Sequence, residues 1–237
     1  MTGSTRGIGH ATARELAARE IDVVLTGRTV SPQLKLLAKE IAAEFGVTTL
    51  ALPYSLSAPS SADDLIAAVT AWSGRLDILV ANAGIWNGGR IDQLDEESRW
   101  QLVEVNLRGT QRIAEAALPA LRASKGSITL VSSIVGLVGF SGDTAYAAAK
   151  AGIIGFGRSL AKEVARQDVR VNILAPGFVA TEMTSQVSCK ARARISDRIL
   201  LGRFGSVDEV ARAAAFLAVD ATYCTGTVLA VDGGWSL

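Results

Sequence analysis

Short apolar runs rich in β-branched residues alternate along the chain with longer segments in which apolar residues recur every three or four positions. The first pattern is typical of buried strands, and the second is typical of helices that cover them. The alternation predicts βαβ units, and therefore an α/β fold with a doubly wound parallel sheet. We expect strands in IDVVLTG, VTTLAL, LDILVANAG, SITLVSS, VRVNILAPG and GTVLAVDGG, and helices over residues 11–19, 32–45, 63–72, 94–121 and 145–165.

Composition indicates one folded domain over residues 1–237, because no Pro-, Gly- or Ser-rich linker and no internal repeat divides the sequence. Apolar residues make up 49% of the chain and the mean hydropathy is +0.30, which excludes a disordered protein. Lys and Arg number 24 against 23 Asp and Glu, so net charge favours neither nucleic acid nor an anionic membrane as a partner. A local basic cluster could dock a partner, although a solvated helix face is the simpler interpretation; it comprises Lys190, Arg192, Arg194 and Arg198.

Cysteine and histidine content restricts the chemistry further. Cys189, Cys224 and His10 are the whole supply of these residues, too few for a disulfide framework or a metal site of ordinary ligand number. No early apolar stretch of the given sequence has a basic lead and a small-residue cleavage site, and no apolar run approaches the roughly eighteen residues that a bilayer span needs. We therefore expect a metal-free, cytoplasmic protein.

Three glycines near the start of the chain precede a helical pattern directly, in MTGSTRGIGHATARELAA. Gly3, Gly7 and Gly9 would let backbone N–H groups approach a pyrophosphate at a helix N-terminus, where the helix dipole favours negative charge. The same glycines suit a tight turn without a ligand. The loop alone leaves both interpretations open.

The end of the next apolar run bears on the choice of dinucleotide. A protein that selects NAD usually carries Asp or Glu about twenty residues after the loop, where the acid accepts hydrogen bonds from the ribose 2′-hydroxyl. Gly27, Arg28 and Thr29 occupy that place here. Arg28, together with Arg6 in the loop, could bind a 2′-phosphate, which favours NADP over NAD.

The segment YAAAK places Tyr146 and Lys150 on one face of a helix. A phenol has a reference pKa of about 10, and a neighbouring ammonium lowers it by favouring the phenolate. A tyrosine adjusted in this way can give or take a hydroxyl proton. An ordinary amphipathic helix can carry the same pair, so the motif gains weight only from its surroundings.

Taken together with further motifs, this pair resembles the pattern of the short-chain dehydrogenase/reductase family. The resemblance covers essentially the whole chain, residues 2–234, and Ser133 lies thirteen positions before Tyr146, as the family's catalytic serine does. It implies a Rossmann-like fold and a nicotinamide-dependent oxidoreductase. The matching positions are Thr2, Gly3, Gly7, Gly9, Asn82–Gly84 (NAG), Asn106, Ser133, Tyr146, Lys150, Pro176, Gly177 and Thr181.

The resemblance implies a role for each of four catalytic residues. Ser133 would hydrogen-bond the substrate oxygen, and Tyr146 would protonate the developing alkoxide while NADPH delivers hydride. Lys150 would hold the nicotinamide ribose hydroxyls and lower the pKa of the tyrosine. Asn106 would anchor a water that relays protons to Lys150.

The resemblance also implies where the cofactor lies. Asn82–Gly84 would approach the adenosine ribose, and residues 176–181 would hold the carboxamide side of the nicotinamide. Ser55 departs from the pattern, because the family often has Asp at that place. The full set of expected NADP(H)-binding residues is Gly3, Thr5, Arg6, Gly7, Ile8, Gly9, Arg28, Ser55, Asn82, Ala83, Gly84, Tyr146, Lys150, Pro176, Gly177, Val179 and Thr181.

The substrate is less determined than the chemistry. Two segments are similar to those of 3-oxoacyl-[acyl-carrier-protein] reductases: YAAAKAGIIGFGRSLAKEVA, and the segment from GRFGSVDEV to VDGG. This similarity implies a thioester carbonyl as substrate and an acyl-carrier protein as partner. Relatives that act on sugars, diketones, steroids or quinones share these segments, so such small carbonyl substrates stay open. Besides Ser133, Trp86 and Phe178 would line the substrate pocket or belong to the core, and residues 184–203 would form a lid.

Two further expectations concern assembly and turnover. The helix over 145–165 is apolar or small around much of its circumference. The resemblance implies a homotetramer in which this helix and the preceding long helix pack across one two-fold axis. A truncated dinucleotide-binding protein without turnover is the alternative from another class. All four catalytic residue types are present, which argues against it.

In folds of this kind a buried strand precedes the glycine loop, but only Met1 and Thr2 precede it here. We expect the first strand to be missing, with six parallel strands, a gap or distorted closure between IDVVLT and DILVAN, and a poorly anchored loop. Losing about five buried residues costs on the order of 10 kcal/mol, so we interpret Met1 as a misplaced or truncated start. Restoring five to eight apolar residues before Met1 should raise the melting temperature and the NADPH affinity together.

Overall fold

The computed structural model describes residues 1–58, 60–185 and 187–237. Six parallel strands within these residues confirm the predicted strands and the α/β class: β1 (Val23–Gly27), β2 (Thr49–Pro53), β3 (Ile78–Ala81), β4 (Ser127–Val131), β5 (Arg170–Pro176) and β6 (Val228–Val231). The helices are α1 (Gly7–Ala17), α2 (Pro32–Phe45), α3 (Ser61–Ser73), α4 (Glu96–Val103), α5 (Gly109–Ser124), α6 (Val135–Val138), α7 (Thr144–Val164), α8 (Glu182–Ser185), α9 (Cys189–Arg198) and α10 (Val207–Ala215).

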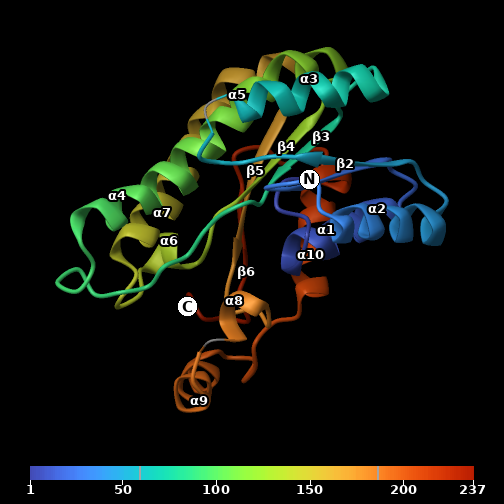
Figure 1. Cartoon of the computed structure of the whole chain (residues 1–237). Coiled ribbons are helices and arrows are strands. Elements are labelled where there is room, and N and C mark those ends of the chain that lie inside the picture. Colours follow the sequence, from blue (N-terminus) through green and yellow to red (C-terminus); the bar gives the residue numbers. More distant parts are fainter. Residues whose placement is uncertain (59, 186) are drawn as a thin grey trace.

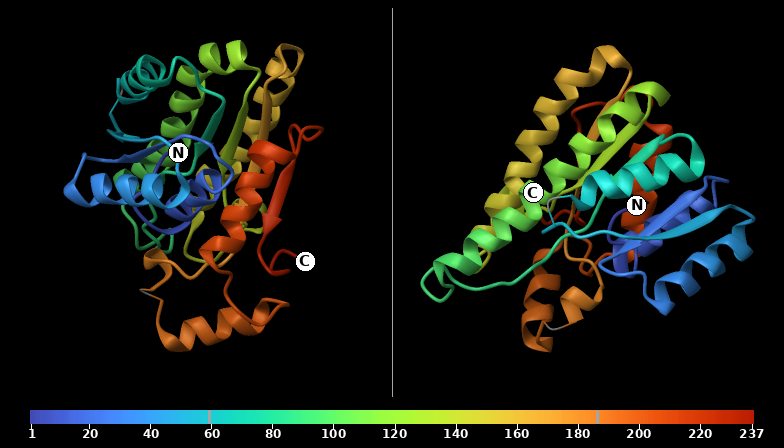
Figure 2. Two further views of the ribbon diagram at one scale, coloured as in Figure 1. Left: turned by 90° about the vertical axis from the view of Figure 1, so that its right-hand side faces the viewer. Right: turned by 45° about the horizontal axis from the view of Figure 1, so that its top comes forward.

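Helices cover the strands from both sides (Figures 1 and 2). On one side α3, α5 and α7 pack around Leu79 and Ile128. On the other side α1, α2 and α10 pack around Leu25 and Leu174. Because successive side chains of a strand point to opposite faces, a strand buried on both faces needs apolar residues at nearly every position. This requirement explains the continuous apolar runs of the sequence.

The strands form two hydrogen-bonded sets, with the orders β1-β2 and β3-β4-β5-β6. Val23 pairs with Thr49 in the first set, and Ile78 pairs with Ser127 in the second. Among the described residues β1 and β3 share no ladder, and a cavity of about 330 Å³ lies between them. The predicted gap between IDVVLT and DILVAN is thus confirmed.

Residues 1–4 occupy one end of this gap. The amino nitrogen of Met1 donates to the Val24 carbonyl at 3.1 Å, on the β1 side. The Thr2 N–H donates to the Val80 carbonyl at 3.0 Å, on the β3 side. The first residues of the chain therefore act as the carboxyl end of a strand between β1 and β3.

The glycine loop is firmly anchored, so the expectation of a poorly anchored loop is wrong. The Ser4 N–H donates to the Thr26 carbonyl at 3.1 Å. The hydroxyl of Thr2 accepts the N–H groups of Asn82 and Ala83 at 3.0 Å each. These bonds to loop residues and side chains replace the ladder that a full first strand would supply.

One predicted helix is broken in two. The sequence predicts a single helix over residues 94–121, but a π-helical turn, Glu104–Arg108, separates α4 from α5. A π-turn inserts one residue without interrupting the apolar periodicity, so the pattern does not reveal it. This turn carries Asn106.

The carboxyl-terminal part of the chain contains a helix that the sequence analysis did not predict. α10 begins with a capping box, in which the Ser206 hydroxyl accepts the Glu209 N–H at 3.2 Å and the Glu209 carboxylate accepts the Ser206 N–H at 2.8 Å. Its sequence, Ser-Val-Asp-Glu, is a recognisable helix start. Of the helices that the described ranges contain, none combines the length and the apolar character needed to cross a membrane.

Candidate active site

The glycine loop packs against the segment that follows β3. Gly3 and Gly7 have φ angles of +64° and +55°, which residues with a Cβ rarely adopt. A Cβ on Gly9 would lie 2.0 Å from the Gly3 carbonyl oxygen and 2.6 Å from Asn82 Nδ2. Asn82 Nδ2 donates to the carbonyl oxygens of Thr2 and Gly3 at 3.2 Å each. The structure therefore brings the first glycines and the NAG segment into direct contact.

The N-terminus of α1 is suited to bind an anion. Arg6 is its N-cap residue, and within the described residues the Arg6 side chain makes no capping hydrogen bond. The first-turn N–H groups, those of Gly7 and Ile8 among them, therefore remain available. Thr181 lies opposite, because a Cβ on Gly7 would be 3.7 Å from Thr181 Cγ2. A pyrophosphate fits such an uncapped helix end.

The two arginines expected at a 2′-phosphate have different surroundings. Arg6 forms an ion pair with Glu182 at the start of α8, and both side chains are largely exposed. Arg28 is exposed just after β1. Next to it, a Cβ on Gly27 would lie 2.9 Å from Thr5 Cγ2, so Thr5 is close to the end of β1. The structure places both arginines at the carboxyl edge of the strands, with Arg6 paired to Glu182.

Ser55 lies two residues beyond β2, at the same edge. Its N–H donates to Ser61 Oγ at 2.9 Å, and its hydroxyl lies 3.0 Å from Ser57 Oγ. The preceding Tyr54 is buried and donates its hydroxyl to the Gly109 carbonyl at 3.3 Å. Ser55 is thus at the edge of the strands where the adenine is expected, with its side chain bonded within its own turn.

Tyr146 and Lys150 lie one turn apart in α7. The Lys150 ammonium is 5.5 Å from the centroid of the Tyr146 ring. Lys150 is only 3% exposed, and its Nζ donates to the Val131 carbonyl at 3.0 Å. Burial lowers the pKa of Lys150 to about 8, so its charged form still predominates at neutral pH.

The pKa of the Tyr146 hydroxyl shifts in the opposite direction to that of Lys150. Burial raises the pKa of Tyr146, and the nearby Asp143 carboxylate raises it further. Asp143 accepts the indole N–H of Trp86 at 2.8 Å, and burial raises the pKa of Asp143 too. The Gly89 N–H also donates to the Gly142 carbonyl at 2.7 Å. The loop after β3 therefore closes against the start of α7.

Asn106 connects the NAG segment to Lys150. Its side chain is fully buried, and its Oδ1 accepts the Ile85 N–H at 3.0 Å. Its Nδ2 donates at 2.9 Å to the Ile85 carbonyl and to a carbonyl one turn earlier in its own helix. A Cβ on Gly84 would lie 2.7 Å from Asn106 Oδ1 and 3.6 Å from Lys150 Nζ. The amide thus fixes the backbone beside Lys150, while its service as a water anchor stays a prediction.

Ser133 follows β4 and is half-buried, with its Oγ accepting the Val135 N–H at 3.2 Å. Its neighbour Ser132, which the sequence analysis did not single out, is buried and donates to the Lys150 carbonyl at 2.7 Å. That bond ties the end of β4 to α7. The serine and the tyrosine–lysine pair are therefore on directly connected elements.

The segment after β5 is held close to β6. The Gly177 N–H donates to the Val231 carbonyl at 2.9 Å, and a Cβ on Gly177 would lie 2.6 Å from Asp232 Cα. Val179 is buried and pairs with Gly205 in a short parallel bridge. This path leads the chain from Pro176 past the N-terminus of α1.

Phe178 belongs to a cluster of aromatic rings. Its ring centroid lies 4.8 Å from that of Trp235, 5.6 Å from that of Phe140 and 5.7 Å from that of Phe204. Trp86, by contrast, is 38% exposed and bonded to Asp143. The structure therefore shows Phe178 and Trp86 in separate surroundings.

A groove of about 300 Å³ lies between this cluster and α9. α9 belongs to the segment expected to form a lid, residues 184–203. Phe140 and Trp235 line one side of it. Lys190, Arg194 and Arg198 line the other, and the Arg198 guanidinium lies 4.5 Å from the centroid of a Trp235 ring. The groove combines positive charge with aromatic surface. Position 186 of the expected lid lies outside the described residues.

Sequence reasoning missed five residues of this region: Ser132, Phe140, Asp143, Glu182 and Trp235. Asp143 immediately precedes a helix, a position that favours Asp, and Ser132 is next to the serine that the motif supplies. The other three meet residues far away in the sequence. A single sequence carries no signal for such contacts.

Comparison with known proteins extends over almost the whole chain. A family model described as Enoyl-(Acyl carrier protein) reductase matches residues 3–236. The chain is 39% identical to the 3-oxoacyl-[acyl-carrier-protein] reductase FabG of Escherichia coli over 236 residues, covering 99% of the chain and 95% of that relative. It is 40% identical to FabG of Thermotoga maritima over 238 residues, with the same coverage of 99% and 95%. A crystal structure of a putative short-chain alcohol dehydrogenase from Sinorhizobium meliloti 1021 superposes with a TM-score of 0.93 at 33% identity, covering 99% of this chain and 94% of that one.

Proposed function

Because the chain belongs to the short-chain dehydrogenase/reductase family, oxidoreductases that act on carbonyl and alcohol groups, we propose that it is an NADPH-dependent ketone reductase. The proposed reaction turns the ketone of a 3-oxoacyl thioester into a secondary alcohol, or runs in reverse. The names of the FabG relatives support this substrate class.

The observation that carries the proposal is the placement of Lys150. Its ammonium is buried between the Tyr146 ring at 5.5 Å and the Gly84 backbone, with Val131 as its carbonyl partner. Burying a charged ammonium costs free energy unless the group is paired or fully hydrogen-bonded. A single carbonyl bond leaves further N–H donors of the ammonium for ribose hydroxyls and for stabilising a phenolate.

The residues present fit a nicotinamide dinucleotide. The uncapped N-terminus of α1 can receive the pyrophosphate, and Gly9 leaves no room for a side chain that would push the loop away. Arg28 and Arg6 can bind a 2′-phosphate, which supports NADP over NAD. When bound, NADPH supplies the hydride.

The chain's own residues handle the proton. Tyr146 donates its phenolic proton to the substrate oxygen as negative charge develops there. In this structure burial and the Asp143 carboxylate raise the pKa of Tyr146, contrary to the expected lowering by Lys150. The Lys150 ammonium, 5.5 Å from the ring centroid, would stabilise negative charge on the phenol as its proton leaves. The hydroxyl of Ser133 donates a hydrogen bond to the same oxygen. Asn106 holds the backbone that borders this site.

The groove beside α9 favours a substrate with an anionic group on an apolar chain. Its three cations and two aromatic rings suit the phosphate and the linker of a carrier-bound or coenzyme A thioester. A matched pair of substrates tests this preference: acetoacetyl-CoA and the acetoacetyl thioester of N-acetylcysteamine, which lacks phosphate. We expect a higher kcat/KM for the first, and equal values would remove the argument from the groove.

The proposal includes a homotetramer that packs α7 across a two-fold axis. Ala148, Ala151 and Gly155 are exposed on α7 although they carry no polar group. A row of small exposed residues lets a second helix approach closely. The family resemblance supplies the symmetry.

Replacing Tyr146 by Phe tests the catalytic assignment. The variant keeps the ring but lacks the transferable proton, so we expect less than about a tenth of the wild-type kcat with NADPH affinity retained. NADPH oxidation and a fluorescence titration measure the two quantities. Tyr223→Phe, at a fully exposed tyrosine, is the matched control and should leave both unchanged. A Tyr146→Phe variant that keeps more activity than this would refute the role of the tyrosine.

A further inference from the structure

Asp143 places a carboxylate at the start of α7 without capping that helix. It is the N-cap residue of α7, where an aspartate usually accepts a first-turn N–H. Within the described residues its side chain makes no such bond. It accepts instead the indole N–H of Trp86, 57 residues away in the sequence, at 2.8 Å. The carboxylate is therefore held by the loop after β3.

The loop after β3 packs closely around this bond. A Cβ on Gly88 would lie 2.4 Å from Trp86 Cζ2 and 3.2 Å from Asp143 Oδ1, so a side chain there would displace the indole. One residue later, the Gly89 N–H donates to the Gly142 carbonyl at 2.7 Å. Two hydrogen bonds and a close packing contact thus fix the position of Asp143.

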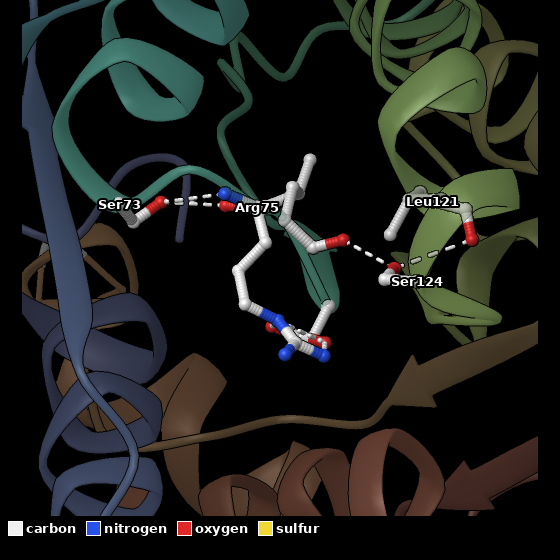
Figure 3. A network of polar contacts seen from close by, with 6 residues as sticks. Ser73, Arg75, Leu121 and Ser124 are labelled. Carbon is white, nitrogen blue, oxygen red and sulfur yellow. Dashed lines mark hydrogen bonds and ion pairs between the residues drawn. The ribbon is translucent and has the colours of Figure 1, made fainter.

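The charge of Asp143 is not balanced by a cation. Among the residues that the structure describes, no lysine or arginine pairs with it, and Trp86 offers one neutral N–H to one of its oxygens. The turn before β3 shows the contrast, because Arg75 binds both carboxylate oxygens of Asp77 there (Figure 3). Burial raises the pKa of Asp143, as expected for a carboxylate removed from water without a cationic partner.

The reacting carbonyl of a substrate would lie beside this negative charge. Tyr146 is one turn after Asp143, and the carboxylate raises the pKa of Tyr146 beyond the effect of burial. A carbonyl oxygen that takes the Tyr146 proton therefore has the carboxylate as a neighbour. The charge of opposite sign, on Lys150, is 5.5 Å from the Tyr146 ring centroid and bonded to the Val131 carbonyl.

Other charged groups around α7 do not compensate Asp143. α6 carries no charged residue. The charged side chains on the other elements packed against α7 are exposed or bonded elsewhere; those of α4, the π-turn and β5 are Glu96, Glu97, Arg99, Glu104, Arg108 and Arg170. Asp143 and Lys150 are therefore the charges that Tyr146 faces within the described part of the chain.

Positive charge begins one short turn away. The Asp143 N–H donates to the Phe140 carbonyl at 3.1 Å, which closes a turn over residues 140–143. Phe140 lines the groove whose cations belong to α9. This turn thus separates a negative surface beside Tyr146 from a positive surface beside α9.

We propose that Asp143 is a specificity-determining residue that rejects substrates with an acid group beside the reacting carbonyl. The inference rests on the proposed reductase function and narrows its substrate class. A 3-oxo acid is accepted as a neutral ester or thioester, with any negative charge far enough away for the α9 groove to bind it. Like charges placed close together at a binding site strongly disfavour the wrong substrate, so one carboxylate suffices to reject the free acid.

Acetoacetate and its ethyl ester test the proposal, because they present the same ketone with and without the negative charge. At about pH 8 the wild type should show a kcat/KM at least about tenfold higher for the ester. Asp143→Asn removes the charge but keeps an oxygen that can accept the Trp86 N–H. It should raise kcat/KM for acetoacetate at least about tenfold relative to the ester. This ratio cancels any effect of the variant on Tyr146, which acts on both substrates.

Two further variants separate charge from structure. Asp143→Glu keeps the charge and should keep the preference for the ester. Glu163→Gln removes a charge from an exposed position of α7, about 25 Å from Tyr146 along the helix, and should leave the ratio unchanged. An unchanged ratio in Asp143→Asn would overturn the proposal, and so would an equal gain for acetoacetate in Asp143→Glu.

A second measurement uses the wild type alone, and therefore does not depend on how well the variants fold. 5-Oxohexanoate carries its acid two carbons farther from the ketone than acetoacetate does. Because repulsion falls with distance, the preference for the ethyl ester should be at least about threefold smaller for this pair. An equal preference for both pairs contradicts the proposal. A wild type that reduces neither ester refutes the proposed reductase function itself, whereas reduction of the esters without these differences refutes only the role of Asp143.

Discussion

Replacing Lys150 by Met changes the stability of the protein in a way that depends on pH. The side chain is 3% exposed and burial lowers its pKa from 10.5 to about 8. Methionine has a similar length and no charge, so it can fill the same space. The variant therefore isolates the free-energy cost of a buried ammonium.

The magnitude follows from the pKa difference between the folded and unfolded states. A lowering from 10.5 to about 8 corresponds to about 3 kcal/mol, at 1.36 kcal/mol per pKa unit. Between pH 8 and 10.5 the unfolded chain binds more protons at Lys150 than the folded chain, so this residue makes the free energy of unfolding rise with pH across that window. Below pH 8 the full cost of the charged amine is present in the folded state.

Urea unfolding of the cofactor-free protein at pH 7 and pH 10.5 measures this effect. The difference in the free energy of unfolding, Lys150→Met minus wild type, should fall by about 3 kcal/mol from the lower to the higher pH. The lost hydrogen bond to the Val131 carbonyl lowers the variant's stability at both pH values and leaves the change intact. Lys162→Met, at an exposed lysine of the same helix, is the control and should show no such change. A constant difference for Lys150→Met would refute the argument.

Two further predictions concern the cofactor and the assembly. NADPH should be used at least about tenfold more efficiently than NADH, equivalent to about 1.4 kcal/mol, and Glu182→Gln should increase the preference because it frees Arg6 from its ion pair. Equal kcat/KM values for the two cofactors would contradict the predicted NADPH preference. An unchanged NADPH-to-NADH ratio in Glu182→Gln would contradict the role of the ion pair. Light scattering at micromolar concentration should give the mass of four chains of 24.7 kDa, whereas a monomer would contradict the proposed packing of α7.

The strands were predictable because burial on both faces requires runs of apolar residues, and such runs can be seen in the sequence. β3, β4 and β5 lie between two helical layers, and their residues are apolar except for Ser127, Thr129, Arg170 and Asn172. The gap beside β1 was also predictable, since the glycine loop begins at the third residue of the chain. These features follow from burial and chain length, which a single sequence displays.

The anchoring of the glycine loop was not predictable in the same way. The sequence-based expectation of a poorly anchored loop took account only of backbone hydrogen bonds between neighbouring strands. In the structure the Thr2 hydroxyl and the Asn82 amide side chain supply bonds across about eighty residues of sequence. The same holds for Arg6 with Glu182 and for the Trp86–Asp143 bond. Side-chain pairs far apart in sequence leave no periodic pattern, so only the folded structure reveals them.

The spacing between Ser133 and Tyr146 has a physical reason in this structure. A Cβ on Gly136 would lie 2.7 Å from the Ala151 nitrogen and 3.0 Å from Lys150 Cβ, so α6 and α7 are in backbone contact there. Together with the bond from Ser132 to the Lys150 carbonyl, this contact fixes the segment after β4 on both sides of Ser133. The serine and tyrosine therefore cannot shift independently, since each is attached within a few residues to the same turn of α7. The number of residues between Ser133 and Tyr146 is therefore set by local contacts, and the spacing can be recognised in a sequence. Arg6 and Glu182 are brought together only by the arrangement of the many elements between them, so their spacing carries no such signal.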